Sequence, residues 1–164
     1  MAVFRIPEQK QPVFSGFSLA LDGIRDPGNL GTIIRLCDWF GIENLFCSPD
    51  TVDCYNPKVV QATMGSITRV NVVYSPLDEI KQAAGNKTVL GAFMNGENVY
   101  TSKLPAEGIL VMGNEANGIS EEVERLVTHK ISIPPFGNSS STESLNVATA
   151  TAILLSEFRR QQNY

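Results

Sequence analysis

The sequence predicts an α/β fold in which a mostly parallel sheet is flanked by helices. Three observations lead to this prediction: short apolar runs recur along the chain, segments of helical periodicity separate them, and turn residues mark several boundaries. Strands that alternate with helices are typical of strand–helix–strand units and therefore of parallel sheets. The chain has 164 residues, of which 43% are hydrophobic, and this suits one domain with a full core.

The first predicted elements are a strand over residues 17–21, a helix over residues 30–40 and a strand over residues 44–47. The strands are predicted from the runs Phe-Ser-Leu-Ala-Leu and Asn-Leu-Phe-Cys. The helix is predicted because its apolar residues recur at helical spacing and fall on one face. These residues are Leu30, Ile33, Ile34, Cys37 and Phe40.

The middle of the chain is predicted to hold a short helix, a strand and a second helix. The short helix, over residues 57–62, begins at a proline, which is favoured in the first helical turn. A strand is expected over residues 68–73. The second helix, over residues 77–84, ends at Gly85, since glycine readily adopts the backbone conformation that ends helices.

Three more strands are predicted over residues 87–93, 108–112 and 130–133. A helix over residues 120–127 begins at a serine that can cap it, and its first turn is acidic. A long final helix is expected over residues 144–160. Ligands of such sheets bind beyond the carboxyl ends of the strands, so the loops that follow strands are the candidate sites.

Residues 1–16 contain Pro7, Pro12 and Gly16, and we expect them to form an arm or the remnant of a linker before a domain over residues 17–164. No apolar run approaches the roughly 18 residues of a membrane span, and no signal-peptide core is present. We therefore expect a soluble, cytoplasmic protein without a membrane partner.

The net charge and the cysteine and histidine content narrow the possible functional classes of the protein further. The formal charge of −4 argues mildly against a free-standing nucleic-acid binder, although a local basic site or a basic partner domain would be compatible with it. Cys37, Cys47 and Cys54 form no C-x-x-C pair, so neither a disulfide framework nor a metal site is predicted. His129 has no partner motif and is interpreted as an isolated structural residue.

The loop and helix start over residues 22–35 form the first candidate site. A Pro-Gly turn precedes Asn29, which is expected to cap the helix. Because helical side chains lean towards the N-terminus, Arg35 would reach back over Gly31 and form a phosphate clamp with the helix start. The alternative is a surface ion pair between Arg35 and Asp38. The residues alone favour neither interpretation.

The sequence Gly113-Asn114-Glu115-Ala116-Asn117-Gly118 follows one predicted strand and precedes a helix. This is the context of the dinucleotide fingerprint G-x-G-x-x-G, whose middle glycine lets a pyrophosphate approach the backbone. Here Glu115 replaces that glycine, and its carboxylate would repel phosphate. The turn therefore predicts a nucleotide-like ligand without a pyrophosphate. The alternative is an ordinary turn with a solvated Glu115.

The segment between the last strand and the final helix is the third candidate site. Ile133 ends the strand, and a Ser-Leu-Asn-Val sequence that begins at Ser144 opens the helix. In the loop between them, Ser140 and Glu143 have the spacing of a capping box. Ser144 and Asn146 could reach a ligand, or they could only satisfy backbone groups at the helix start.

Together, the three segments resemble the SpoU, or TrmH-like, branch of the SPOUT superfamily of methyltransferases. The motifs of that family are N-x-G-x-x-x-R, G-x-E-x-x-G, and a terminal I-P followed by S-L-N-V. This chain has them in the same order, starting at Asn29, Gly113, Ile133 and Ser144. The resemblance extends from residue 17 to the C-terminus, and the combination is far more specific than any one motif.

The resemblance implies a deep trefoil knot, in which the final helix passes through a loop and S-adenosyl-L-methionine binds. It implies a homodimer that methylates a ribose 2′-hydroxyl of transfer or ribosomal RNA. The implied catalytic residues are Asn29, Arg35, Glu115, Ser144 and Asn146. The residues implied to bind the cofactor are Gly91, Ala92, Met112, Gly113, Ile133 and Leu145.

Two departures from the family pattern and one alternative function remain open. The loop before Ser144 is longer than the commonest family pattern, and the short segment 1–16 stands where many members carry an RNA-binding domain. We therefore expect either a minimal member or a chain that lacks an N-terminal RNA-binding domain. The alternative function is a non-enzymatic RNA- or cofactor-binding module that retains the fold. The glutamate in the fingerprint and the absence of G-x-x-x-x-G-K-[ST] argue against oxidoreductases and P-loop enzymes.

Overall fold

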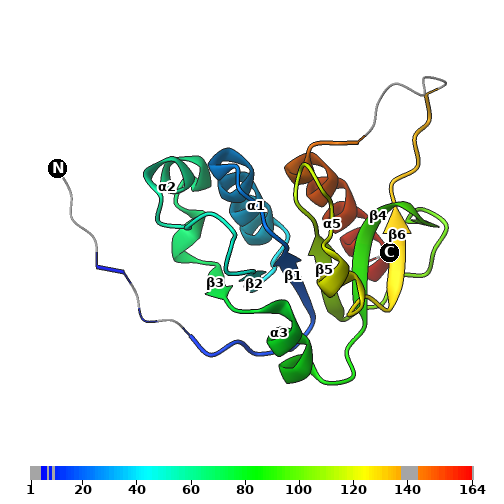
Figure 1. Ribbon diagram of the computed structural model, residues 1–164, viewed down its shortest axis with the longest axis horizontal. Helices are drawn as coiled ribbons and strands as arrows, with labels where there is room; N and C mark the ends of the chain where they lie inside the picture. Colours follow the sequence, from blue (N-terminus) through cyan, green and yellow to red (C-terminus); the bar gives the residue numbers. More distant parts are fainter. Residues whose placement is uncertain (1–4, 7, 9, 138–143, 164) are drawn as a thin grey trace.

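The structure confirms the predicted parallel sheet with flanking helices. The computed structural model describes the chain except for residues 1–4, 7, 9, 138–143 and 164 (Figure 1). Within these bounds, six strands form one sheet in the order β3-β2-β1-β5-β4-β6, and all neighbouring pairs are parallel. The strands are β1 (Phe17–Leu21), β2 (Asn44–Cys47), β3 (Asn71–Tyr74), β4 (Val89–Asn98), β5 (Gly108–Met112) and β6 (His129–Ser132).

Helices cover both faces of this sheet. On one face lie α1 (Pro27–Trp39), α2 (Pro57–Thr63) and α5 (Val147–Asn163), and on the other lie α3 (Leu77–Ala84) and the short α4 (Glu121–Glu124) (Figure 1). Each layer buries its own cluster of apolar side chains against the sheet. None of the helices in the described part of the chain is long and apolar enough to span a membrane.

The central strand β1 is buried on both faces. Leu19 and Leu21 belong to the apolar cluster beneath α1 and α5, whereas Ala20 belongs to the cluster beneath α3 and α4. β1 pairs with β5 in a register that places Leu21 opposite Met112. Because the two strands run in the same direction, the loops that follow them leave the sheet at the same edge.

The arm before β1 is attached to the sheet. Asn44 and Asn71, on β2 and β3, each donate a side-chain hydrogen bond of 3.1 Å to a carbonyl group of the arm. The ring of Phe14 stacks on that of Phe46 with a centroid distance of 5.5 Å. The last residues of the arm are therefore packed against the domain.

One predicted strand begins later in the structure, after a short helical turn. Residues Ser66–Thr68 form a 3-10 turn, and β3 begins only at Asn71, so the strand predicted over residues 68–73 is wrong in its first half. Gly65 starts the turn with φ +90°, and the Thr68 hydroxyl donates to the Gly65 carbonyl at 2.9 Å. These local hydrogen bonds compete with strand pairing.

Other boundaries differ at the carboxyl half of the chain. β4 continues to Asn98, and its register against β6 shifts between Ala92 and Glu97. α4 is shorter than predicted, although Ser120 caps it as expected. α5 begins later than predicted, at Val147. The capping box predicted within the preceding loop lies outside the described residues.

Gly31 is a contact point between α1 and α2. A Cβ atom built on Gly31 would lie 2.4 Å from Ala62 Cβ and 2.9 Å from the Val59 carbonyl oxygen. The two helices therefore pack too closely for a side chain at this position. The space beside Gly31, over which Arg35 was expected to reach back, is filled by α2.

We expect Gly31→Ala to destabilise the protein. Overpacking costs about 1–3 kcal/mol, of which the better helix propensity of alanine returns up to about 1 kcal/mol. In urea denaturation the free energy of unfolding should fall by about 1–2 kcal/mol. Thr32→Ala, at an exposed neighbouring position, is the control and should change it by less than about 0.5 kcal/mol. Equal stability of the two variants would contradict this account of Gly31.

Candidate functional site

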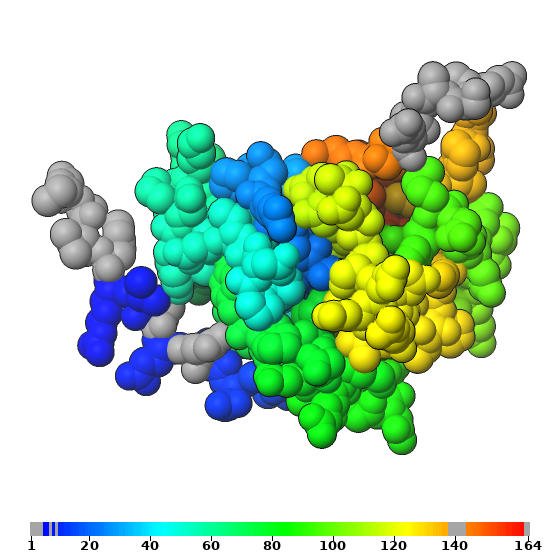
Figure 2. Space-filling view, in the orientation of Figure 1, coloured from blue at the N-terminus to red at the C-terminus, as the bar shows by residue number. Residues whose placement is uncertain are grey.

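Three segments that are distant in the sequence meet at one edge of the sheet. They are the start of α1, the 113–118 turn after β5 and the segment before α5. In Figure 2 their atoms lie side by side, in blue, yellow-green and orange. Side-chain hydrogen bonds join all three segments. This edge is formed by the carboxyl ends of parallel strands, where α/β proteins bind ligands.

Asn29 is at the centre of this contact. Its Nδ2 donates to Glu115 Oε1 at 2.8 Å, and its Oδ1 accepts from Asn146 Nδ2 at 2.9 Å. An ionised carboxylate only accepts hydrogen bonds, so Glu115 sets the orientation of the Asn29 amide. One residue from each of the three motifs therefore takes part in a single cluster of hydrogen-bonded side chains.

Asn29 does not cap α1, so that prediction is wrong. The cap is Asp26, whose Oδ1 accepts from the Asn29 backbone N–H at 2.7 Å. Asn29 thus lies inside the first turn, and its side chain is available for partners outside the helix. An aspartate followed by a proline at the first helical position is the sequence signal that identifies Asp26 as the cap.

Asn146 has two roles in the structure. Its Oδ1 accepts from the backbone N–H groups of Ala148 at 3.0 Å and Thr149 at 3.2 Å, so it caps α5. Its Nδ2 donates to Asn29. The two possibilities that the sequence left open for Asn146, backbone capping and contact with the site, therefore both apply. Ser144 is exposed and makes no hydrogen bond within the described part of the chain.

The 113–118 turn is closed by its own backbone. Asn114 and Gly118 exchange two backbone hydrogen bonds of 2.8 and 2.9 Å, and Gly118 has a φ of +71°. A Cβ atom on Gly113 would lie 2.2 Å from the carbonyl carbon of Gly118. Both glycines are therefore required by the shape of the turn, and Glu115 is exposed near its tip.

Arg35 is exposed and has no ion-pair or hydrogen-bond partner among the residues that the structure describes. The predicted alternative, a pair with Asp38, is wrong. Asp38 instead bonds Arg69 at 2.7 Å and the Ser66 hydroxyl at 2.7 Å. The hydrogen bond from Arg69, helped by Ser66, holds the pKa of the Asp38 carboxyl below its usual value. Among the described residues, the guanidinium of Arg35 therefore stays without a partner on the same helix as Asn29.

Of the residues implied to bind the cofactor, Gly91 and Ala92 lie near the start of β4, and Gly113 and Ile133 directly follow β5 and β6, which are the neighbours of β4 in the sheet. Gly91 lies opposite Val111 on β5, and Ala92 lies opposite Ile131 on β6. Met112 ends β5. The sheet therefore brings these positions together, although they are far apart in the sequence.

Gly91 has a structural explanation that does not involve a ligand. A Cβ atom there would lie 2.5 Å from the Phe93 ring and 3.0 Å from a methyl carbon of Val127. A side chain at this position would therefore require the Phe93 and Val127 side chains to shift. A cofactor contact at Gly91 stays a prediction.

The cysteines are buried and unpaired. Burial raises the pKa of the thiols of Cys37, Cys47 and Cys54, so they are protonated near neutral pH. No group of three or more His, Cys, Asp or Glu side chains in the described ranges is arranged to hold a metal ion.

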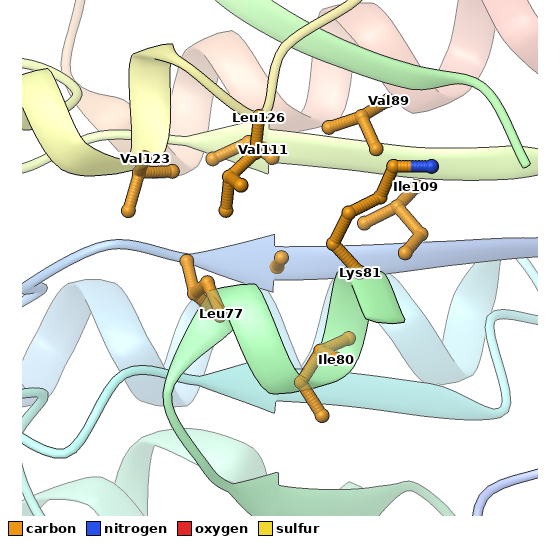
Figure 3. A pocket seen from close by; sticks show the side chains of 9 residues that line it. Leu77, Ile80, Lys81, Val89, Ile109, Val111, Val123 and Leu126 are labelled. Carbon is orange, nitrogen blue, oxygen red and sulfur yellow. The ribbon is translucent and has the colours of Figure 1, made fainter. Parts of the chain in front are cut away.

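A small apolar cleft lies on the opposite face of the sheet, between α3 and the strands (Figure 3). Its one charged side chain, Lys81, donates to the carbonyl oxygens of Gly85 at 2.6 Å and Lys87 at 3.0 Å, and so stabilises the end of α3. Without free polar groups, the cleft has none of the convergent donors and acceptors of a specific ligand site. The candidate site is therefore the cluster of hydrogen-bonded side chains around Asn29.

The comparisons with known proteins agree on one family. The SpoU rRNA Methylase family matches residues 16–156. The chain is 33% identical over 162 residues to the 23S rRNA (guanosine(2553)-2'-O)-methyltransferase RlmP of Bacillus subtilis, covering 96% of this chain and 63% of that protein. It is 34% identical over 149 residues to a 23S rRNA (uridine(2479)-2'-O)-methyltransferase of Streptomyces viridochromogenes, covering 85% of this chain and 52% of that protein.

Solved structures share the fold. A TrmH-family protein from Porphyromonas gingivalis has a TM-score of 0.87 and 45% identity, over 94% of this chain and 63% of that one. The SpoU methyltransferase AviRb from Streptomyces viridochromogenes, solved in complex with AdoMet, has a TM-score of 0.83 and 32% identity, over 96% of this chain and 66% of that one.

The strand order and the motif residues gathered at the carboxyl edge define an α/β domain of the SPOUT type. The chain belongs to the SpoU rRNA methylase family, which confirms the family predicted from its motifs. It spans 63% of the Bacillus subtilis relative and 52% of the Streptomyces viridochromogenes relative.

Two substitutions separate the roles of Asn146. Asn146→Asp keeps the oxygen that caps α5 and loses the donor to Asn29, whereas Asn146→Ala loses both. The free energy of unfolding should fall by about 1 kcal/mol in Asn146→Ala and by less than about 0.5 kcal/mol in Asn146→Asp. Chemical denaturation measures both values. Equal losses in the two variants would show that the cap contributes nothing to stability.

Proposed function

We propose that residues 17–164 are the catalytic domain of an S-adenosylmethionine-dependent methyltransferase that methylates a ribose 2′-hydroxyl of transfer or ribosomal RNA. The observation that carries the proposal is the hydrogen-bonded group of Asn29, Glu115 and Asn146, in which the three motifs meet at the ligand-binding edge of the sheet. The 23S rRNA 2'-O-methyltransferases among the relatives support this reaction. We place the activity in the cytoplasm.

The residues at this edge fit S-adenosylmethionine. The backbone groups of Gly113, Ile133 and Leu145 make no hydrogen bond within the described part of the chain, and the Leu145 side chain is 47% exposed. Free backbone donors and acceptors beside an apolar side chain suit the edge and the face of an adenine ring. When bound, the cofactor supplies a methyl group that is electrophilic because a sulfonium carries it.

Methyl transfer to a hydroxyl then depends on alignment of the 2′-oxygen and removal of its proton. Asn29, Glu115 and Asn146 offer amide and carboxylate groups that can bind ribose hydroxyls and fix their direction. Ser144 adds a hydroxyl group to the segment before α5. In this proposal these four residues position the ribose.

Arg35 is proposed to bind a phosphate of the RNA and to stabilise the negative charge that develops on the 2′-oxygen. Its exposure and its lack of an ion-pair partner in the described part of the chain leave the guanidinium available. An arginine is a poor base because its guanidinium keeps its proton in proteins. We therefore assign it charge stabilisation in preference to proton abstraction.

Arg35→Ala tests this role. We expect kcat for tritiated methyl transfer to bulk RNA to fall by about 100- to 1000-fold, because the positive charge that stabilises the developing negative charge on the 2′-oxygen is lost. The affinity for S-adenosylmethionine, measured by calorimetry, should stay within about threefold. Arg35→Lys keeps the charge without the planar donors and should recover part of the rate. Near-parental turnover in Arg35→Ala would remove Arg35 from the mechanism.

We also propose that the chain forms a homodimer through the outer face of α1 and α2. Trp39 is 81% exposed at the end of α1, and Met64 is 74% exposed just after α2. The hydrogen bond between Asp38 and Ser66 brings these two helix ends together. Large apolar side chains that lie close together and exposed on one face are typical of a protein interface.

Trp39→Glu should dissociate this dimer. A buried tryptophan commonly contributes 2 kcal/mol or more to an interface, so the dimer dissociation constant should rise by about 30-fold or more. Sedimentation equilibrium measures the change. Ala83→Glu, on the exposed side of α3 in the other layer, is the matched control and should leave the constant unchanged. A parental dissociation constant in Trp39→Glu would place the interface elsewhere.

The trefoil knot is part of the same proposal. β6 lies beside β4 at one edge of the sheet, and the chain then returns so that α5 packs against α1 (Figure 1). This path is compatible with a threaded final helix, as is the likeness to solved SPOUT-type structures.

Two measurements distinguish the enzyme from the alternative function, which is a non-enzymatic RNA- or cofactor-binding module. Calorimetry with S-adenosylmethionine comes first, followed by methyl transfer to bulk RNA. Cofactor binding without transfer to any RNA would favour the module. Transfer that is abolished by Asn29→Ala would favour the enzyme.

A further inference from the structure

Asn114 connects the loop after β1 to the turn after β5. Its Nδ2 donates to the carbonyl oxygen of Gly23, in the loop between β1 and α1. Its Oδ1 accepts from the backbone N–H groups of Ala116 at 2.8 Å and Asn117 at 3.3 Å. One side chain therefore stabilises its own turn and also holds the opposite loop.

Gly23 is held on both sides. Its N–H donates to the buried Ser48 hydroxyl at 2.8 Å, and its carbonyl accepts from Asn114. Its φ of +68° favours glycine, and a Cβ atom there would lie 2.9 Å from Asp50 Oδ2. The surrounding chain thus restricts this loop to one backbone conformation.

A second hydrogen bond joins the same two segments. The Ser120 backbone N–H donates to Asp22 Oδ2 at 2.7 Å, and Asp22 is a buried residue directly after β1. Asn114 and Ser120 flank the tip of the turn, whereas Asp22 and Gly23 are consecutive. A single attachment would let the turn pivot against the loop, but two attachments define its orientation.

The path from these attachments to the candidate site is short in both segments. On one side, Gly23 leads to Asp26, which caps α1 and binds the Asn29 N–H at 2.7 Å. On the other side, Glu115 directly follows Asn114. The bond between Asn29 and Glu115 is exposed, and water competes for both of its groups. The two partly buried attachments, which are less open to water, therefore set the separation of these two side chains.

We propose that Asn114 is a positioning residue, which fixes the start of α1 against the 113–118 turn and so sets the geometry of Asn29 and Glu115. This inference rests on the methyl-transfer function proposed above. Only a primary amide supplies both the donor to Gly23 and the acceptor for the turn. Because a displacement of about 1 Å in a catalytic site can cost about 100-fold in rate, the role should be visible in turnover.

Asn114→Asp isolates the attachment to Gly23. Aspartate keeps the oxygen that accepts from Ala116 and Asn117, so the turn retains its own cap, but it loses the donor to Gly23. Asn117→Asp adds the same charge to the same turn. It is the matched control, because the Asn117 side chain makes no hydrogen bond in the described part of the chain.

The first measurement does not require activity. Amide hydrogen exchange of the free protein, followed by NMR, reports on the Gly23 and Asn29 N–H groups. We expect both to exchange about tenfold faster in Asn114→Asp than in Asn117→Asp, while the Ala116 N–H stays protected in both. Equal exchange at Gly23 and Asn29 in the two variants would overturn the proposal.

The second measurement separates positioning from binding. In Asn114→Asp, kcat for RNA methylation should fall by about 10- to 100-fold, with KM for RNA and for S-adenosylmethionine within about threefold. Asn117→Asp should keep parental values. A defect confined to the two KM values would overturn the positioning role. If the parental protein methylates no RNA, the proposed function fails, and the exchange rates still decide whether Asn114 holds the loop.

Discussion

The candidate site depends on the parallel pairing of β1 with β5 at the centre of the sheet. In this register Leu21 lies opposite Met112, and the Asp22 N–H extends the ladder by donating to the Met112 carbonyl at 2.9 Å. The next residues of both segments therefore emerge at the same edge. The start of α1 and the 113–118 turn have no local connection in the chain, so this pairing is what brings Asn29 and Glu115 into contact.

This arrangement requires segments of backbone to approach each other closely. That requirement explains the glycines of the motifs. Gly31 allows α1 to contact α2, and Gly113 allows the turn to close on Gly118. Their role is steric and internal to the chain. The polar motif residues Asn29, Glu115 and Asn146 have a different role, since they bond one another at the surface. The motifs thus contain two kinds of residue: glycines that shape the edge of the sheet, and polar residues whose side chains lie at the surface there.

Much of the fold could be predicted from the sequence, because buried strands and amphipathic helices are patterns of neighbouring residues. The strands over residues 17–21, 44–47 and 108–112 and the helix over residues 77–84 have the predicted bounds. Two of the boundary errors, at the starts of α1 and α5, occur where one polar hydrogen bond decides the boundary. Asp26 caps α1 in place of Asn29, and Asn146 delays the start of α5.

The sequence by itself determined the fold class, the family and the identity of the motif residues, since these depend on local pattern and motif order. Only the tertiary structure decided which side chains are partners. Asn29 bonds residues that are 86 and 117 positions away, and Asp38 bonds Arg69, 31 positions away, instead of Arg35 on its own helix. Helical spacing relates side chains only within a turn or so, whereas contacts across the sheet edge depend on how the strands pair and the helices pack.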